Sequence, residues 1–256
     1  MANKELLRCL FLHTQPPLYY EWPAEGGSPY LGAAHGLMGI LYAMLHCPPL
    51  LQDPMAVMDI KAGIRYVLAH EQDVPGSPSG SGGHYPTQMG QLKRNSDRVL
   101  VHWCHGAPGA VFLLCKAHEV FGGGGDGAAY LPAACRAGEV VWSRGLLRKG
   151  PGLCHGVAGN GFALHRLWKS GAGAKWLHRS QQFGLALGDE EVQQTFHNPD
   201  NPYSLFQGSA AGLSFIADVL AATNAQHHHV ASLGTDAGPV KASSVPMMLG
   251  FPLYEP

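Results

Sequence analysis

Four segments of the chain share a pattern in which a polar residue and a glycine lead through small residues into apolar positions at helical spacing. Their sequences are HGLMGILYAML at 35–45, HGAPGAVFLLCKA at 105–117, HGVAGNGFALHRLW at 155–168 and QGSAAGLSFIADVL at 207–220. Apolar residues three and four positions apart lie on one face of an α-helix, and small residues suit the turn that begins it. Each segment therefore predicts a loop that enters a helix packed against its neighbours.

More amphipathic helical patterns lie between these segments, at 55–70, 131–147 and 174–188. A glycine-initiated helix alternates with an amphipathic helix at a period of about fifty residues, which is typical of repeated helical hairpins. Strand patterns are nearly absent. The sequence therefore predicts an all-α fold in which residues 1–256 form a single domain.

Three stretches interrupt the helical pattern. Residues 73–98 and 122–127 are rich in glycine, and a chain of this composition buries little apolar surface. Residues 222–247 carry few apolar positions at helical spacing and precede an apolar terminus. We expect flexible inserts at 73–98 and 122–127, and a weakly ordered segment at 222–247.

Composition and charge exclude several classes of protein. The formal net charge is -1, with 14% charged and 46% hydrophobic residues, so no basic surface indicates nucleic acid and no acidic tail indicates a basic partner. No stretch approaches the roughly 18 apolar residues of a membrane span. The apolar block near the amino terminus is too short for the core of a signal peptide. These features predict a cytoplasmic protein whose thiols are reduced.

Two of the helix-opening loops carry a Cys-His-Gly sequence, at Cys104-His105 and at Cys154-His155. If the hairpins stack side by side, these loops meet at one rim and offer thiols and imidazoles, the ligands that suit zinc. Adjacent side chains seldom both reach one ion. We therefore expect three protein ligands and an open fourth position, which is the arrangement of a catalytic zinc site.

Two other interpretations of the cysteines remain open. A buried cysteine is commonly a small hydrophobic core residue, and we expect this of Cys9, Cys47, Cys115 and Cys135. The two Cys-His pairs could instead supply activated thiolates without a metal, because a helix amino terminus and a neighbouring imidazole both lower the pKa of a thiol.

The motifs GAAHGL, HWCHGAPG, GLCHGVAGN and PYSLFQGSAAG, with PPLYYEW before them and FPLYEP at the end, resemble those of the eukaryotic LanC-like proteins. These proteins are relatives of the bacterial lanthionine cyclases. The resemblance runs from about residue 17 to the end, apart from the two inserts. It implies an α/α toroid with a zinc site at one end, of which this sequence carries the carboxy-terminal part, about four of seven hairpins.

The resemblance also implies roles for individual residues. The zinc ligands would be Cys104, Cys154 and His155, which leaves His105 outside the metal site. His35 matches the histidine proposed in the family as an acid or orienting group, and His105 is the alternative proton donor. Positions that contact glutathione in the LanC-like branch correspond here to Lys149, His197, Asn198, Pro199 and Asp200.

The implied activity is the addition of glutathione to dehydroalanine or dehydrobutyrine residues in proteins. Zinc would be the cofactor, glutathione the co-substrate, and a protein or peptide that contains a dehydroamino acid the partner. Zinc can hold an incoming thiol as thiolate at pH 7, and a histidine can then supply the proton that the addition requires. The resemblance also allows peripheral association with the plasma membrane.

Departures from the family pattern favour a second hypothesis, a non-catalytic scaffold or signalling protein that binds zinc and glutathione. The amino-terminal hairpins and an aspartate of the bacterial cyclases are absent. Leu100 occupies the position of an arginine in the cyclases, Gln207 that of an acidic residue in the LanC-like branch, and His197 that of an arginine. A third hypothesis, a glycosidase, needs two positioned carboxylates, and Asp200 is the only one in the helix-opening loops.

Overall fold

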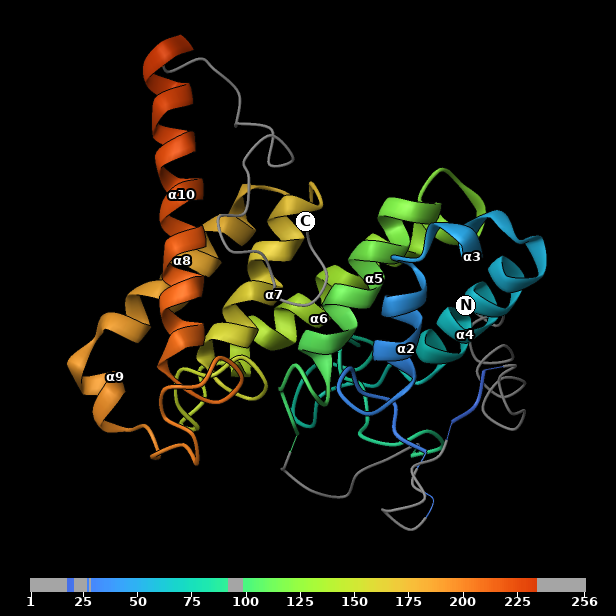
Figure 1. The fold of residues 1–256 in the computed structure, drawn as a ribbon, viewed down its shortest axis with the longest axis horizontal. Coiled ribbons are helices and arrows are strands. Elements are labelled where there is room, and N and C mark those ends of the chain that lie inside the picture. Colours follow the sequence, from blue (N-terminus) through green and yellow to red (C-terminus); the bar gives the residue numbers. More distant parts are fainter. Residues whose placement is uncertain (1–17, 21–26, 28, 92–98, 234–256) are drawn as a thin grey trace. The chain divides into compact units, whose positions relative to one another are not determined.

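The computed structural model describes residues 18–20, 27, 29–91 and 99–233, and Figure 1 shows their helices. Within these ranges the chain forms helices and isolated bridges but no strand, so the all-α prediction is confirmed. The α-helices are α2 (Leu37–Met44), α3 (Pro48–Gln52), α4 (Pro54–Ala69), α5 (Ala107–Phe121), α6 (Tyr130–Arg144), α7 (Val157–Lys169), α8 (Ala174–Gly188), α9 (Glu190–Gln194) and α10 (Ser209–Leu233). None of the described helices is both long and apolar enough to span a membrane.

The chain divides into two compact units, Met1–Val140 and Val141–Pro256. In the first unit, α2 packs against α4 and α5. The glycine-initiated α5 buries ten of its fifteen residues, whereas α4 buries only one face, which includes Ile60, Ile64 and Val67. The Asp53 carboxylate begins α4 by accepting a hydrogen bond from the Met55 amide at 2.9 Å, as expected of an N-cap residue.

Part of the stretch after α4, which we expected to bury little, is packed into the first unit. Val74, His84, Tyr85 and Met89 are buried there. The His70 imidazole, just before this stretch, lies 2.9 Å from the Tyr66 carbonyl through Nδ1 and accepts from the Gly90 amide through Nε2, also at 2.9 Å. Residues 92–98 lie outside the described ranges, and the flexibility of the insert stays a prediction.

Carboxylates hold this glycine-rich stretch in place. The buried Glu71 carboxylate forms two hydrogen bonds with the Arg136 guanidinium on α6, at 2.6 and 2.7 Å, and accepts a third from the Gly83 amide at 2.9 Å. The Asp73 carboxylate accepts from the amides of Gly80 and Gly82. Burial and the negative charge of Glu71 together raise the pKa of the nearby Tyr85 phenol well above its ordinary value. Side-chain anions therefore organise a segment whose composition suggests a linker.

In the second unit, α7, α8 and α10 lie side by side and pack on one another (Figure 1). Every side chain of α7 from Val157 to Trp168 is buried. The Phe162 ring on α7 meets the Phe215 ring on α10 edge-on, with centroids 5.1 Å apart. Gly161 permits this contact, because a Cβ atom there would lie 2.3 Å from the Phe215 ring.

Two of the expected irregular segments contain helix. Residues Gly125–Ala129 form a short 3-10 helix, η2, whose Asp126 carboxylate pairs with the Arg65 guanidinium at 2.9 Å. Helix α10 continues to Leu233, so the weakly ordered segment expected at 222–247 is helical over residues 222–233. Residues 234–247 lie outside the described ranges.

Lowering the pH from 7 to 5 is expected to destabilise the protein through His165. Burial and the charge of Lys169 lower the pKa of this imidazole to about 4 in the folded chain, against an ordinary value of 6.5. Between these values only the unfolded chain binds the proton, so the free energy of unfolding should fall by about 2 kcal/mol over this change. Urea unfolding at pH 7 and pH 5 should show that the free energy of unfolding falls less for His165→Leu than for the unmodified protein. An identical fall in both proteins would show that His165 is not the residue responsible.

Candidate metal centre

A tight loop before α5 carries Cys104. The His102 amide donates to the His105 carbonyl at 3.1 Å, and an isolated bridge joins Val101 to Gly106. Gly106 has a φ of +114°, and a Cβ atom there would lie 2.2 Å from the Leu100 carbonyl oxygen, so the glycine after Cys-His is required. The Cys104 carbonyl faces Gly32, where a Cβ atom would lie only 2.1 Å away. The loop is therefore fixed closely against the segment that precedes α2.

A second loop, before α7, carries Cys154 and His155. The amides of Leu153 and Cys154 both donate to the Phe206 carbonyl, at 2.9 and 2.8 Å, and the Val157 amide donates to the Gly150 carbonyl at 3.0 Å. Both Cys154 and His155 are partly buried. The backbone thus holds the thiol and the imidazole at the amino end of a fully packed helix.

Cys104, Cys154 and His155 form a group that could hold a metal ion. One ligand atom from each of these residues lies within 4.8 Å of the other two. Zinc bonds of about 2.3 Å to sulfur and about 2.0 Å to nitrogen place tetrahedral ligand atoms roughly 3.5 to 3.8 Å apart, so a bound ion would draw these atoms closer together. Two thiols and one imidazole also match the ligands of catalytic zinc sites. His105 does not belong to this group.

The other cysteines were expected to be core residues, and the structure describes three of these four. Cys115 on α5 is buried, whereas Cys47 and Cys135 are only partly buried. Cys9 lies outside the described residues. Full burial of the thiol is therefore confirmed for Cys115 alone among the three that the structure describes.

His35 and His105 lie in a cluster of three rings with Tyr30. The ring centroids of His35 and His105 are 6.0 Å apart, and the Tyr30 ring lies 6.0 Å from His35 and 5.6 Å from His105. His35 is exposed, and His105 is partly buried. The sequence patterns did not identify Tyr30. Tyr30 lies five residues before His35 in the sequence. The Leu37 amide, two residues after His35, donates to the Tyr30 carbonyl at 3.1 Å and so holds the two segments together.

The residues expected to contact glutathione come partly together. The His197 amide donates to the carbonyl of Arg148, the neighbour of Lys149, at 2.7 Å. Lys149, His197, Asn198 and Asp200 are exposed, and Pro199 is partly buried. The structure therefore brings the backbone of the Lys149 turn beside that of residues 197–200.

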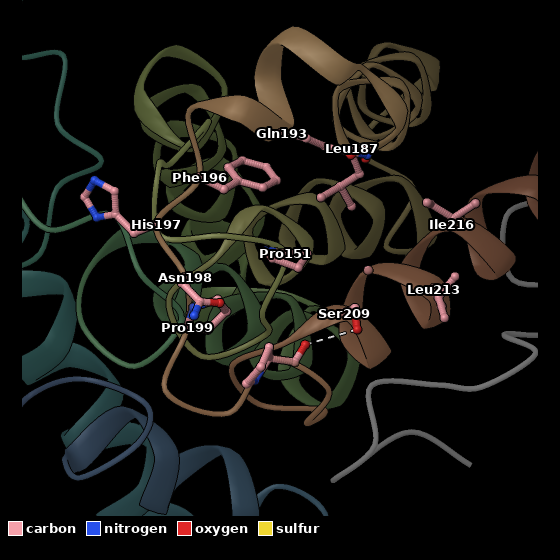
Figure 2. Close-up of a pocket in the computed structure, with 12 residues that line it drawn as sticks. Pro151, Leu187, Gln193, Phe196, His197, Asn198, Pro199, Ser209, Leu213 and Ile216 are labelled. Carbon is pink, nitrogen blue, oxygen red and sulfur yellow. Dashed lines mark hydrogen bonds between the residues drawn. The ribbon is translucent and has the colours of Figure 1, made fainter.

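A pocket of about 520 Å³ lies in the second unit, at the amino end of α10 (Figure 2). Three of the residues expected to contact glutathione line it, whereas Lys149 and Asp200 do not. Most of its wall was not identified from the sequence, because it comes from several separate segments. The lining residues are Pro151, Leu187, Gln193, Phe196, His197, Asn198, Pro199, Pro202, Ser209, Gly212, Leu213 and Ile216.

Two of the positions that depart from the family pattern have defined surroundings. The Leu100 carbonyl faces Gly106 in the loop that carries Cys104. The Gln207 side-chain oxygen accepts a hydrogen bond from the Asn201 amide group at 2.9 Å. A neutral carboxamide at Gln207 thus stabilises the loop that leads into α10.

Comparison with known proteins agrees with these observations. Nisin cyclase, an α/α toroid, matches the structure with a TM-score of 0.61 at 15% identity, over 83% of this chain and 55% of nisin cyclase. Glutathione S-transferase LANCL1 of Danio rerio is 38% identical over 213 residues, which are 82% of this chain and 47% of that protein. LanC-like protein GCL1 of Arabidopsis thaliana is 36% identical over 211 residues, 81% of this chain and 44% of that protein.

The chain thus spans less than half the length of these two curated relatives. The model of the family described as lanthionine synthetase C-like protein matches residues 4–230, which is most of the sequence. On this match, the chain belongs to the lanthionine synthetase C-like family.

Proposed function

We propose that the protein is a zinc-dependent enzyme that adds the thiol of glutathione to dehydroalanine or dehydrobutyrine residues in proteins. The observation that carries this proposal is the group formed by Cys104, Cys154 and His155, whose ligand atoms lie within 4.8 Å of one another. The relative from Danio rerio, which is named a glutathione S-transferase, supports glutathione as the thiol substrate.

Two thiolates and one imidazole would hold zinc and leave one position for the substrate thiol. When bound, zinc would stabilise that thiol in its deprotonated, nucleophilic form at neutral pH. The sulfur forms a bond to the β-carbon of the dehydroamino acid while the electron pair of the double bond moves toward the α-carbon and its carbonyl. A proton added at the α-carbon completes the product, so sulfur and hydrogen add across one double bond and nothing is released.

His35 is the residue that we assign to proton donation. Its imidazole is exposed and lies in the ring cluster with His105, the residue that follows Cys104. A histidine is suited to this step because its ordinary pKa lies near the working pH. The rings of Tyr30 and His105 lie beside His35, with centroids 6.0 Å from it.

Glutathione carries two carboxylates, and the exposed turn at Lys149 offers a cation for one of them. Residues 197–200 lie beside this turn through the bond between the His197 amide and the Arg148 carbonyl. We assign Lys149, His197, Asn198, Pro199 and Asp200 to the binding of glutathione on the exposed side of this turn, outside the pocket that three of them line.

A second function, a non-catalytic scaffold that binds zinc and glutathione, is favoured by a different observation. Gln207 and His197 replace charged residues of the family pattern, and the Gln207 side chain is bonded to Asn201 within its own loop. In this case the metal only joins the two loops, and the protein is cytoplasmic or lies peripherally at the plasma membrane as a partner for other proteins.

Incubation with glutathione and a dehydroalanine peptide separates the two functions. We expect mass spectrometry to show a product heavier than the peptide by one glutathione, formed faster than in buffer alone, and to show loss of this excess after zinc is removed with a chelator. A rate equal to that of the uncatalysed addition, with zinc present, would contradict the enzyme and favour the scaffold.

A further inference from the structure

We propose that the pocket at the amino end of α10 binds an apolar side chain of the polypeptide substrate, rather than glutathione itself. This inference rests on the proposed function. It names the feature that the enzyme recognises in its acceptor, the polypeptide that contains the dehydroamino acid. The pocket volume of about 520 Å³ lies within the range of ligand pockets, roughly 300 to 1,000 Å³.

The wall of the pocket is predominantly apolar. Pro151, Leu187, Phe196, Leu213 and Ile216 supply hydrocarbon from separate segments of the second unit. Figure 2 shows the Phe196 ring beside Pro151 and Leu187, with Leu213 and Ile216 on the helix opposite. An aliphatic or aromatic side chain would lose its contact with water in such a site, and this burial is favourable.

The polar groups of the pocket are poorly suited to glutathione. The Gln193 amide group already donates to the Leu187 carbonyl at 2.7 Å, and the Ser209 hydroxyl donates to the Pro202 carbonyl at 3.1 Å. No lysine, arginine, aspartate or glutamate is among the lining residues that the structure describes. The His197 imidazole points away from Phe196 and Pro151 in Figure 2. Two carboxylates and an ammonium group would therefore enter without charged partners, which is unfavourable.

The occupant is a polypeptide because the apolar surface continues beyond the pocket. Leu213, Ile216 and Leu220 lie three and four residues apart on α10, so they share one face of the helix. Leu213 and Leu220 are 70% and 56% exposed, although α10 is otherwise packed against α7 and α8. Seven helical residues extend over about 10 Å, a length that suits several residues of an extended chain better than a small molecule.

The pocket is also close to the metal ligands along the chain. Pro151 lines the pocket and stands three residues before Cys154, within the loop whose amides bond to the Phe206 carbonyl. Three residues span at most about 11 Å even when fully extended. An extended peptide covers this maximum distance in about three residues, so the apolar side chain should lie within about three residues of the dehydroamino acid.

The test measures binding of the full chain to two fluorescent peptides by anisotropy. Both carry alanine in place of the dehydroamino acid, and they differ only in a leucine or a serine three residues away. We expect the leucine peptide to bind about tenfold more tightly, since burial of a leucine side chain is worth this much. Leu213→Asp should weaken binding of the leucine peptide to the level of the serine peptide.

Leu185→Asp is the matched control. Leu185 is 67% exposed on α8 and does not line the pocket, so this variant should bind the leucine peptide as the unmodified protein does. Equal binding of the two peptides, or equal effects of the two variants, would overturn the inference. So would loss of glutathione binding in Leu213→Asp with binding of the leucine peptide intact.

Because these peptides cannot react and their binding is measured without glutathione, the peptide result does not depend on the catalytic proposal. Absence of glutathione addition together with leucine-dependent binding would refute the proposed enzyme and leave the pocket assignment standing. Efficient glutathione addition to leucine and serine versions of the dehydroalanine peptide, with equal kcat/KM, would refute the pocket assignment and leave the enzyme standing.

Discussion

Replacing Cys154 with alanine is expected to reduce bound zinc from about one equivalent to a trace, because the variant removes one of only three protein ligands. The remaining thiol and imidazole, Cys104 and His155, cannot retain the ion during dialysis against a weak chelator. The zinc content of the purified protein, measured by inductively coupled plasma mass spectrometry, checks this result. Glutathione addition to a dehydroalanine peptide should be lost at the same time.

Cys135→Ala is the control for this variant. Cys135 lies partly buried on α6 outside the metal group, so its substitution removes a thiol of similar exposure and should leave the zinc content unchanged. Circular dichroism should show that both variants keep their helices. A full equivalent of zinc in Cys154→Ala would show that the three residues are not the metal site.

Replacing His35 with asparagine is expected to lower kcat for glutathione addition by about 100-fold, since general acid catalysis contributes factors of this order. Asparagine keeps a polar side chain near Tyr30 and His105 but cannot supply a proton near neutral pH. Zinc content should stay at one equivalent, because His35 does not belong to the metal group. The rate at saturating glutathione and peptide, followed across pH 5 to 9, measures the effect.

His178→Asn is the matched substitution for the His35 variant. His178 is an exposed histidine on α8, and its replacement should change neither kcat nor the pH profile. If His35→Asn retains the unmodified rate and pH profile, His105 or solvent supplies the proton. If it loses zinc instead, His35 acts through the metal site and not as a donor.

The positions of the helices could be predicted from the sequence because their apolar residues recur at helical spacing. The pattern at 174–188 corresponds to α8 residue for residue, and the pattern at 55–70 differs from α4 by one residue at each end. The last twelve residues of α10 lack such a pattern, and their helix continues from a packed amino-terminal half. Local periodicity therefore identified helices whose apolar residues are regularly spaced and missed the extension of α10, where they are not.

The packing of residues 73–91 could not be predicted, because the groups that fix it are distant in sequence. Glu71 and Arg136 are separated by 65 residues, and no local pattern pairs them. Glycine-rich composition is common to flexible linkers and to turns whose amides are bonded by carboxylates. Only the three-dimensional arrangement distinguishes the two cases here.

The metal group was predictable in part. The repeated Cys-His-Gly sequence placed two thiols and two imidazoles just before helices. Because each histidine follows a cysteine directly, the sequence could not decide which histidine binds the metal. The family resemblance favours His155, and the geometry groups His155 with both thiols. Tyr30 and the apolar pocket depend on contacts between separate loops, and neither follows from the order of residues alone.

The ion pair between Glu71 and Arg136 bears on how this protein can be engineered. Excision of the glycine-rich stretch would remove the backbone that covers this pair and leave a guanidinium beside the apolar side of α6. Dyes or affinity tags are better attached at Ser79, which is exposed. The space there is open, since a Cβ atom on the neighbouring Gly80 would meet no other atom within 4 Å. The stretch is thus part of the packed structure although its tip is open, and a version without it should be less stable.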